Sequence, residues 1–265
     1  MELNAIVNKI REKIDYEISV GIIIGSGLQA LADILEEKVE ITYDELDMPK
    51  SKVKGHKGSF IFGRLSGKNV MFITRYHFYE NGDFEQVKLP YKIARELGVK
   101  TIVMTTSTGC LNPNFDVGDI MLIKDHINLT GVNPMINDPE EEVVRFLDFQ
   151  NIYDKEYLNI VRDIVKEKNI NIREGVHLQV SGPNYETQAE IVFFGKIGGD
   201  TVSMSTAHDT IIAVYYDMKV LAFACIVDKI IGDNCEELTH DDVLARGNEA
   251  AKNIAGIVKE FISKI

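Results

Sequence analysis

The chain has 265 residues, of which 45% are hydrophobic and 26% are charged, and its formal net charge is -12. This length favours one large domain over residues 1–265, with enough core to hold a rigid site, rather than two small domains. The acidic balance argues against broad binding to nucleic acid or to an anionic membrane, because both require basic surface. A small anionic ligand held by a few local groups is still compatible with it.

The cysteines and the N-terminal segment indicate a cellular compartment. The chain has three cysteines (Cys110, Cys225 and Cys235), an odd number whose spacing matches no metal site. Reduced thiols in the cytosol are the simplest interpretation. Residues 1–19 carry charges throughout and lack the apolar segment of a signal peptide, and no run reaches the roughly 18 apolar residues of a membrane span. We therefore expect a cytoplasmic protein.

Strands and helices are expected to alternate along the chain. Apolar residues at helical spacing predict an amphipathic first helix, and the apolar run 19–24 predicts a buried strand. The other expected helices are 28–37, 84–97, 153–168, 187–197, 207–216 and 241–265, and the other expected strands are 59–63, 69–75, 100–106, 119–126, 176–180, 201–204 and 219–228. This order predicts the α/β class, as a single domain with a mixed, mostly parallel β-sheet flanked by helices.

A glycine-rich loop, GSGLQA at 25–30, follows the first expected strand and opens a helix. This context fits a dinucleotide-binding fingerprint, with Glu40 at the distance of a ribose-binding acid. It equally fits a phosphate cradle made of helix-start N–H groups and the Ser26 hydroxyl. A tight turn without a ligand is a third interpretation. The motifs that follow favour phosphate.

The segment TRYHFYENG places Arg75, His77 and Tyr79 two residues apart, so that they share one face if the chain is extended. A guanidinium grips phosphate through paired N–H bonds, and a histidine adds another donor. A polar edge strand facing water explains the same pattern. His56, between two glycines, fits either a segment that closes over a ligand or an ordinary surface histidine.

Taken in order, these motifs and those that follow resemble the trimeric purine nucleoside phosphorylase family. The segments that carry the resemblance are GSGLQAL, GHKGSFIFG, TRYHFYENG, TTSTGCLN, DHINLTGVNP, GPNYETQAE, VSMSTAHDT, IVDKI and THDDVLARG. The resemblance spans residues 21 to about 250. The resemblance implies a nucleoside phosphorylase-like fold, a homotrimer and the phosphorolysis of purine nucleosides. It implies no cofactor, because inorganic phosphate is a substrate.

The resemblance also implies roles for individual residues. The phosphate ligands would be Ser26, His56, Arg75, His77, Ser205 and the backbone N–H near Ser107. The ribose contacts would be Tyr79, Met204, His240 and, from a neighbouring subunit, Phe146, which could also be an ordinary core or surface aromatic. The base contacts would be Tyr185, Glu186, Val202, Ser203 and Asp228, and the residues expected to act directly in catalysis are Asp228, His77 and Glu186.

Two acids in the expected base site favour different purines. Glu186 would accept the N1–H of a 6-oxopurine, although a carboxylate at a helix N-terminus is also favourable without any ligand. Asp228 stands where the family usually has asparagine. An ionised aspartate accepts a bond from a 6-amino group, and a protonated one donates to N7 as a general acid. We expect inosine and guanosine as substrates, with some tolerance for adenosine from Asp228.

The chain departs from the family elsewhere, and other functions compete. Ser203 replaces a usual glycine, and Ala207-His208-Asp209 replaces a usual small-Pro-Glu run. A methylthioadenosine phosphorylase is the nearest alternative, but the polar His240 suits a 5′-hydroxyl better than a methylthio group. A second alternative, a nicotinamide-dependent oxidoreductase, is suggested by the glycine loop alone. A third, a nucleoside-binding protein without catalysis, is disfavoured because such a protein would not need the phosphate ligands.

Overall fold

The computed structural model describes residues 3–25, 28–53, 58–136, 138, 145–231 and 240–265. Its helices are α1 (Leu3–Arg11), η1 (Gln29–Ile34), η2 (Phe78–Glu80), α2 (Phe84–Glu96), α3 (Lys155–Glu167), α4 (Gln188–Lys196), α5 (Ala207–Tyr215) and α6 (His240–Lys264), of which η1 and η2 are 3-10 helices. Its strands are β1 (Val20–Ile24), β2 (Glu36–Thr42), β3 (Ser59–Leu65), β4 (Lys68–Thr74), β5 (Thr101–Cys110), β6 (Ile120–Asn128), β7 (Arg173–Gln179), β8 (Thr201–Ser203) and β9 (Lys219–Lys229).

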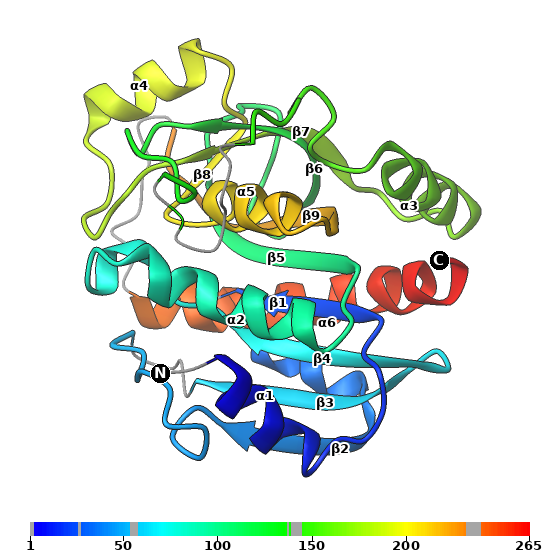
Figure 1. Ribbon diagram of the computed structural model, residues 1–265. Helices are drawn as coiled ribbons and strands as arrows, with labels where there is room; N and C mark the ends of the chain where they lie inside the picture. Colours follow the sequence, from blue (N-terminus) through cyan, green and yellow to red (C-terminus); the bar gives the residue numbers. More distant parts are fainter. Residues whose placement is uncertain (1–2, 26–27, 54–57, 137, 139–144, 232–239) are drawn as a thin grey trace.

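The described strands form one sheet in the order β2-β3-β4-β1-β5-β8-β7-β6-β9, and β5 also pairs with β9. Because β9 pairs with both β6 and β5, the strands from β5 to β9 close on themselves like a small barrel. Strands β2, β3, β4 and β1 continue from β5 as an open sheet (Figure 1). The prediction of an α/β fold with a mixed sheet is confirmed, although four pairings (β2–β3, β3–β4, β5–β8 and β6–β9) are antiparallel among those described.

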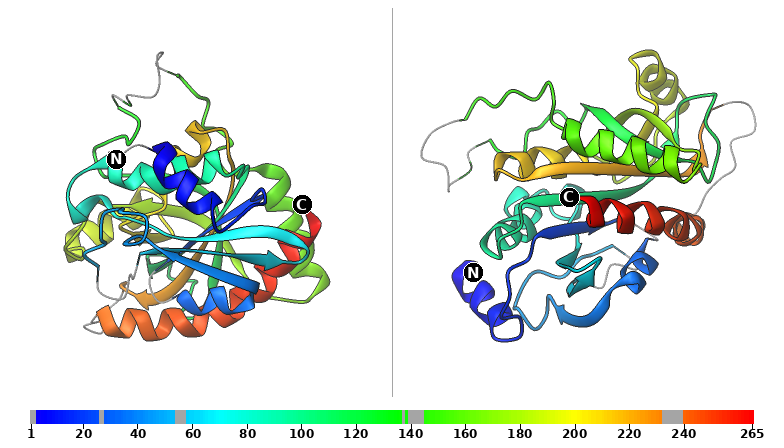
Figure 2. Two further views of the ribbon diagram at one scale, coloured as in Figure 1. Left: turned by 60° about the horizontal axis from the view of Figure 1, so that its bottom comes forward. Right: turned by 90° about the vertical axis from the view of Figure 1, so that its right-hand side faces the viewer.

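Burial explains why the central strands form where they do. Strands β1, β5 and β9 are buried almost throughout, as expected for parallel strands covered on both faces. Helices α1 and α2 cover one face of the open sheet, and α6 lies on the opposite face against η1 (Figure 2). The strand ends that carry polar residues are thereby held on a rigid scaffold.

Two of the expected elements are wrong. The helix expected at 28–37 is only the 3-10 helix η1, and the chain then turns into strand β2, which pairs with β3. In β2, Val39 and Ile41 alternate with charged residues. The pairing of this strand with β3 outweighs the helix propensity of its residues. The strand expected to end at 106 continues to Cys110, because the small residues after Thr106 lie between β8 and β9.

Candidate phosphate and nucleoside site

The polar residues gather where the carboxyl ends of β1, β4 and β5 meet, the edge at which open α/β sheets bind ligands. Gly25 ends β1 so close to β5 that a Cβ on it would lie 2.7 Å from the carbonyl oxygen of Thr105 and 2.8 Å from Cα of Thr106. Glycine is therefore required there by the approach of two backbones. Ser26 and His56 lie outside the described residues.

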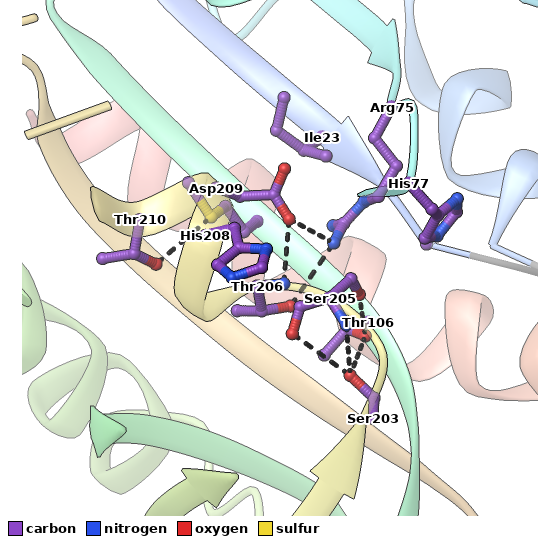
Figure 3. Close-up of polar contacts among 12 residues, drawn as sticks. Ile23, Arg75, His77, Thr106, Ser203, Ser205, Thr206, His208, Asp209 and Thr210 are labelled. Carbon is purple, nitrogen blue, oxygen red and sulfur yellow. Dashed lines mark hydrogen bonds and ion pairs between the residues drawn. The ribbon is translucent and has the colours of Figure 1, made fainter. Parts of the chain in front are cut away.

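Arg75 follows β4 and is buried, with 1% of the residue exposed. Its Nη1 donates to the Asp209 carboxylate at 2.9 Å and to the Thr206 hydroxyl at 3.4 Å, and its Nη2 donates to the Thr105 carbonyl at 2.8 Å (Figure 3). Its Nε is buried and has no hydrogen-bond partner among the described residues. Nε of a guanidinium carries one N–H, so Arg75 keeps one buried donor that is not satisfied by this part of the chain.

Asp209, in the first turn of α5, compensates the charge of Arg75. Its carboxylate also accepts from the Tyr91 hydroxyl at 2.5 Å and from the Thr206 N–H at 2.8 Å. Burial alone would raise the pKa of Asp209, but the charge of Arg75 and these hydrogen bonds lower it. A buried ion pair is tolerated only when its remaining polar atoms are satisfied in this way. Sequence reasoning noted Asp209 as a departure from the family but missed its contact with Arg75.

His77 lies beside Arg75 (Figure 3), although not on a strand. Strand β4 ends at Thr74 and η2 begins at Phe78, so the expected common strand face of Arg75, His77 and Tyr79 is wrong. The turn is closed by Glu80, which accepts from the His77 N–H at 2.7 Å and lies 3.4 Å from its Nδ1.

Further contacts of His77 and Glu80 hold this turn in place. The rings of His77 and Tyr79 stack, with centroids 4.9 Å apart. Burial alone would raise the pKa of Glu80, but bonds from His77, Lys52 and Ser51 lower it to about 2. Glu80 is therefore an anion that fixes the histidine ring.

The turn after β8 brings Ser205 to the same place. Ser205 is buried, and its hydroxyl lies 3.2 Å from the Thr106 hydroxyl on β5. Thr206 has a φ of 89°, which is rare for a β-branched residue and is held by its bonds to Asp209 and Arg75. Ser107, the expected backbone donor, is the next residue of β5. The sequence does not single out Thr106 and Thr206, because a threonine inside a strand or before a helix carries no distinctive signal of a ligand site.

The residues expected to contact the base lie one step further along β5. Gly109 pairs with Val202 on one side and with Asp228 on the other, so both base-site candidates flank the same glycine. Burial, and then the negative charges of Glu190 and Asp228, raise the pKa of Glu186. Burial, and then the negative charges of Glu186 and Asp228, raise the pKa of Tyr185. These residues therefore form one acidic group with an exposed tyrosine.

The expected ribose contacts are only partly brought together. Tyr79 is partly buried near both Arg75 and Tyr185, whose charges affect its pKa, and burial is the main reason that this pKa rises to about 12. Met204 packs against Gly182, where a side chain would collide with its sulfur. The side chain of His240 lies outside the described residues.

Phe146 is 95% exposed, so it is not a core aromatic. It follows Arg145, whose Nη1 donates to the Tyr215 carbonyl at 2.6 Å, at the carboxyl end of α5. Thr206 caps the opposite end of this helix, about 13 Å away at 1.5 Å per residue. Phe146 therefore lies far from the Ser205 of its own chain.

Ser203, expected at the base, uses its hydroxyl within the turn itself, 3.3 Å from both the N and the O of Ser205. Across the described residues, no group of three or more His, Cys, Asp or Glu side chains could hold a metal ion. In the same part of the chain, no helix is long and apolar enough to cross a membrane.

Known proteins are similar to this chain in sequence and in fold. The phosphorylase superfamily matches residues 19–263 of the chain. Purine nucleoside phosphorylase 1 of Bacillus subtilis is 36% identical over 258 residues, which cover 96% of this chain and 95% of that protein. The purine nucleoside phosphorylase of Bos taurus is 38% identical over 256 residues, which cover 93% and 89%.

Solved structures agree over the whole length. The purine nucleoside phosphorylase of Schistosoma mansoni in complex with inosine has a TM-score of 0.90 at 30% identity, covering 99% of this chain and 96% of that one. The same enzyme in complex with adenosine has a TM-score of 0.91 at 31% identity, with the same coverage. The fold and the matched range define a member of the phosphorylase superfamily. Within that superfamily, the chain belongs to the purine nucleoside phosphorylase family.

Proposed function

We propose that the protein cleaves purine nucleosides with inorganic phosphate, releasing the free base and ribose 1-phosphate or its deoxy form. The observation that carries this proposal is the buried Arg75 guanidinium at the carboxyl edge of the sheet, whose Nε–H has no partner in the part of the chain that the structure describes. Because an unsatisfied buried donor is costly, such a group is expected to meet an anionic ligand. The family to which the chain belongs uses phosphate as its nucleophile.

Phosphate is held here chiefly by directed hydrogen bonds. Asp209 already neutralises Arg75, so the Nε–H of the guanidinium serves as a directed hydrogen-bond donor. His77 and the Ser205 hydroxyl converge from the turns after β4 and β8. The remaining proposed ligands are the N–H near Ser107, Ser26 and His56. No cofactor is required in this scheme, since phosphate itself is the second substrate.

The reaction follows from this placement. As the bond between C1′ and N9 breaks, its electron pair leaves with the base and a phosphate oxygen forms the new bond to C1′. The phosphate dianion stabilises the positive charge that develops on the ribose, so catalysis rests on positioning and electrostatics. A protonated Asp228 donates its proton to N7 of the departing base. Tyr79, Met204 and His240 hold the ribose.

Glu186 and Asp228 set the choice of base. Ionised Glu186 accepts the N1–H of hypoxanthine or guanine, whereas adenine has an acceptor at N1. Asp228 accepts from a 6-amino group when it is ionised, which adds tolerance for adenosine. Tyr185 stacks on the base and Val202 flanks it across Gly109 from Asp228. Inosine and guanosine are therefore the main substrates.

The assembly is a homotrimer in the cytoplasm, with residues 1–265 folded as one domain in each subunit. An almost fully exposed Phe146, at the far end of α5 from its own phosphate site, supports donation of this ring to the ribose site of a neighbouring subunit. Aromatic side chains are enriched at protein interfaces relative to the rest of the surface.

Base release from inosine and from adenosine, each with and without inorganic phosphate, tests the function. We expect hypoxanthine release that depends on phosphate, and a slower release of adenine. Release from neither nucleoside would favour a nucleoside-binding protein, and release without phosphate would indicate a hydrolase. The Ser205→Ala variant should raise the phosphate KM, whereas Ser263→Ala, which removes an exposed hydroxyl bonded to Glu260, should leave it unchanged.

A further inference from the structure

The turn between β8 and α5, residues 203–206, is closed by the side chain of its first residue. The N–H of Ser205 donates to Oγ of Ser203 at 3.3 Å, and the Ser203 hydroxyl donates to the carbonyl of Ser205 at 3.3 Å. One hydroxyl therefore engages both backbone polar groups of Ser205. Such a bond between a side chain and the nearby backbone restricts rotation of the two peptide units.

A histidine on the neighbouring strand β7 contacts the same turn. His177 is completely buried, and its Nε2 lies 3.2 Å from the Ser205 carbonyl and 3.1 Å from Oγ of Ser203. A carbonyl oxygen only accepts, so Nε2 carries the proton and Nδ1 accepts from the Thr201 hydroxyl, 3.0 Å away. Burial lowers the pKa of His177 to about 3, which keeps the ring neutral at physiological pH.

These contacts determine where the Ser205 hydroxyl points. With its backbone held by Ser203 and His177, the Ser205 hydroxyl lies 3.2 Å from that of Thr106, on the strand that also gives Arg75 its carbonyl partner (Figure 3). On the other side, the strained Thr206 continues the turn towards Asp209. A rotation of the Ser205 peptide units would move the hydroxyl away from Arg75.

We propose that Ser203 and His177 are positioning residues for phosphate, because together they lock the 203–206 turn and hold the Ser205 hydroxyl beside Arg75. This proposal rests on the proposed function, in which Ser205 is a phosphate ligand. Ser203 is both the last residue of β8, the strand of the base-site residue Val202, and the first residue of the turn, and through its side chain it acts on the phosphate half of the site. Neither residue needs to touch phosphate for this role.

The test combines steady-state kinetics with direct titration of the complete protein with inorganic phosphate. Ser203→Ala should raise the phosphate KM and dissociation constant about three- to tenfold, the effect of one neutral hydrogen bond, and leave the inosine KM within about twofold. His177→Leu should act in the same direction, and His177→Gln, which keeps an N–H near the position of Nε2, should restore much of the affinity.

A matched control separates positioning from stability. Thr101→Val removes a buried hydroxyl that lies 2.7 Å from that of Tyr157 at the opposite end of β5. It should lower Tm to a similar degree as Ser203→Ala and leave phosphate affinity unchanged. In the Ser203→Ala/Ser205→Ala double variant, the first change should have no further effect, because the hydroxyl that it positions is already gone.

The outcomes distinguish the two proposals. If Ser205→Ala weakens phosphate but Ser203→Ala and His177→Leu lower only Tm, the positioning role is wrong and the phosphate site stands. If these variants weakened the binding of inosine and of phosphate equally, the positioning role would also be overturned. If Ser205→Ala itself leaves phosphate binding unchanged, the assignment of Ser205 fails first, and the positioning role fails with it.

Discussion

Arg75 and Asp209 form a buried ion pair, 2.9 Å from Nη1 to Oδ2, in which the two side chains are 1% and 4% exposed. The pair joins the loop after β4 to the first turn of α5, and so connects the open sheet to the barrel-like part of the fold. The arginine that is proposed to hold phosphate is therefore also a structural link between the two halves.

Removing the negative partner should be costly. Asp209→Asn leaves the guanidinium of Arg75 buried without a compensating charge, and we expect the free energy of unfolding to fall by about 3–5 kcal/mol. Urea unfolding at neutral pH measures this change. Asp209→Glu keeps the charge and should cost less, since only the reach of the carboxylate changes.

An exposed ion pair provides the control. Arg145 and Asp217 lie 2.9 Å apart, but the Asp217 side chain is 69% exposed. Asp217→Asn should change the free energy of unfolding by no more than about 1 kcal/mol. Asparagine also tolerates the φ of 61° at this position. Similar losses of unfolding free energy for Asp209→Asn and Asp217→Asn would show that burial of the Arg75–Asp209 pair does not increase its contribution to stability.

The raised pKa of Glu186 predicts the pH dependence of inosine cleavage. The ionised carboxylate is the form that accepts N1–H, so kcat/KM for inosine should fall as the pH drops through this pKa, at a higher pH than for an ordinary glutamate. Glu186→Gln should remove this acidic limb and lower kcat/KM for inosine by about 10- to 100-fold, the range for a hydrogen bond to a charged group.

Adenosine is the internal control for this profile when both nucleosides are measured in the Asp228→Asn variant, in which the contact proposed for the 6-amino group no longer titrates. Its N1 is an acceptor, so adenosine does not benefit from ionised Glu186, whereas the ionisation of phosphate affects both nucleosides equally. The ratio of the two kcat/KM values should therefore shift towards adenosine as the pH falls. A ratio that is independent of pH would exclude Glu186 as the N1–H acceptor.

Asp228 should determine how well adenosine is used. Asp228→Asn replaces an acceptor by an amide that can donate to a 6-oxo group, so kcat/KM for adenosine relative to inosine should fall by about tenfold. Base release from both nucleosides at saturating phosphate measures the ratio. An unchanged ratio would show that Asp228 does not select the base, and its only remaining proposed role would be proton donation to N7.

Much of the scaffold follows from the sequence, because long apolar runs such as 19–24 and 219–228 become buried strands wherever they lie. Strand β2 could not be predicted in this way, because its many exposed charged residues conceal the alternation of apolar and polar residues that is typical of a strand. Its pairing with β3 is seen only in the structure. The position of Arg75 at a strand end was predictable, but its bond to Asp209 was not, because it joins turns 134 residues apart. The role of Ser203 likewise depends on His177 in a different strand.

The close approach of β1 to β5 gives a final prediction at Gly25. An alanine there would place its Cβ 2.7 Å and 2.8 Å from backbone atoms of β5, and neither strand can move away without disturbing the sheet. We expect Gly25→Ala to lower both the free energy of unfolding, by about 1–3 kcal/mol, and the affinity for phosphate. Chemical unfolding and phosphate titration measure the two effects.

Gly195→Ala is the matched control. Gly195 lies inside α4, and a Cβ on it would come no nearer than 3.7 Å to a carbonyl oxygen, that of Leu111. Alanine favours the helix over glycine by about 0.5–1 kcal/mol, so this variant should be slightly stabilised and bind phosphate as before. If Gly25→Ala behaved in the same way, the approach of β1 to β5 would not constrain the start of the glycine loop, and that loop would not depend on β5 for its position.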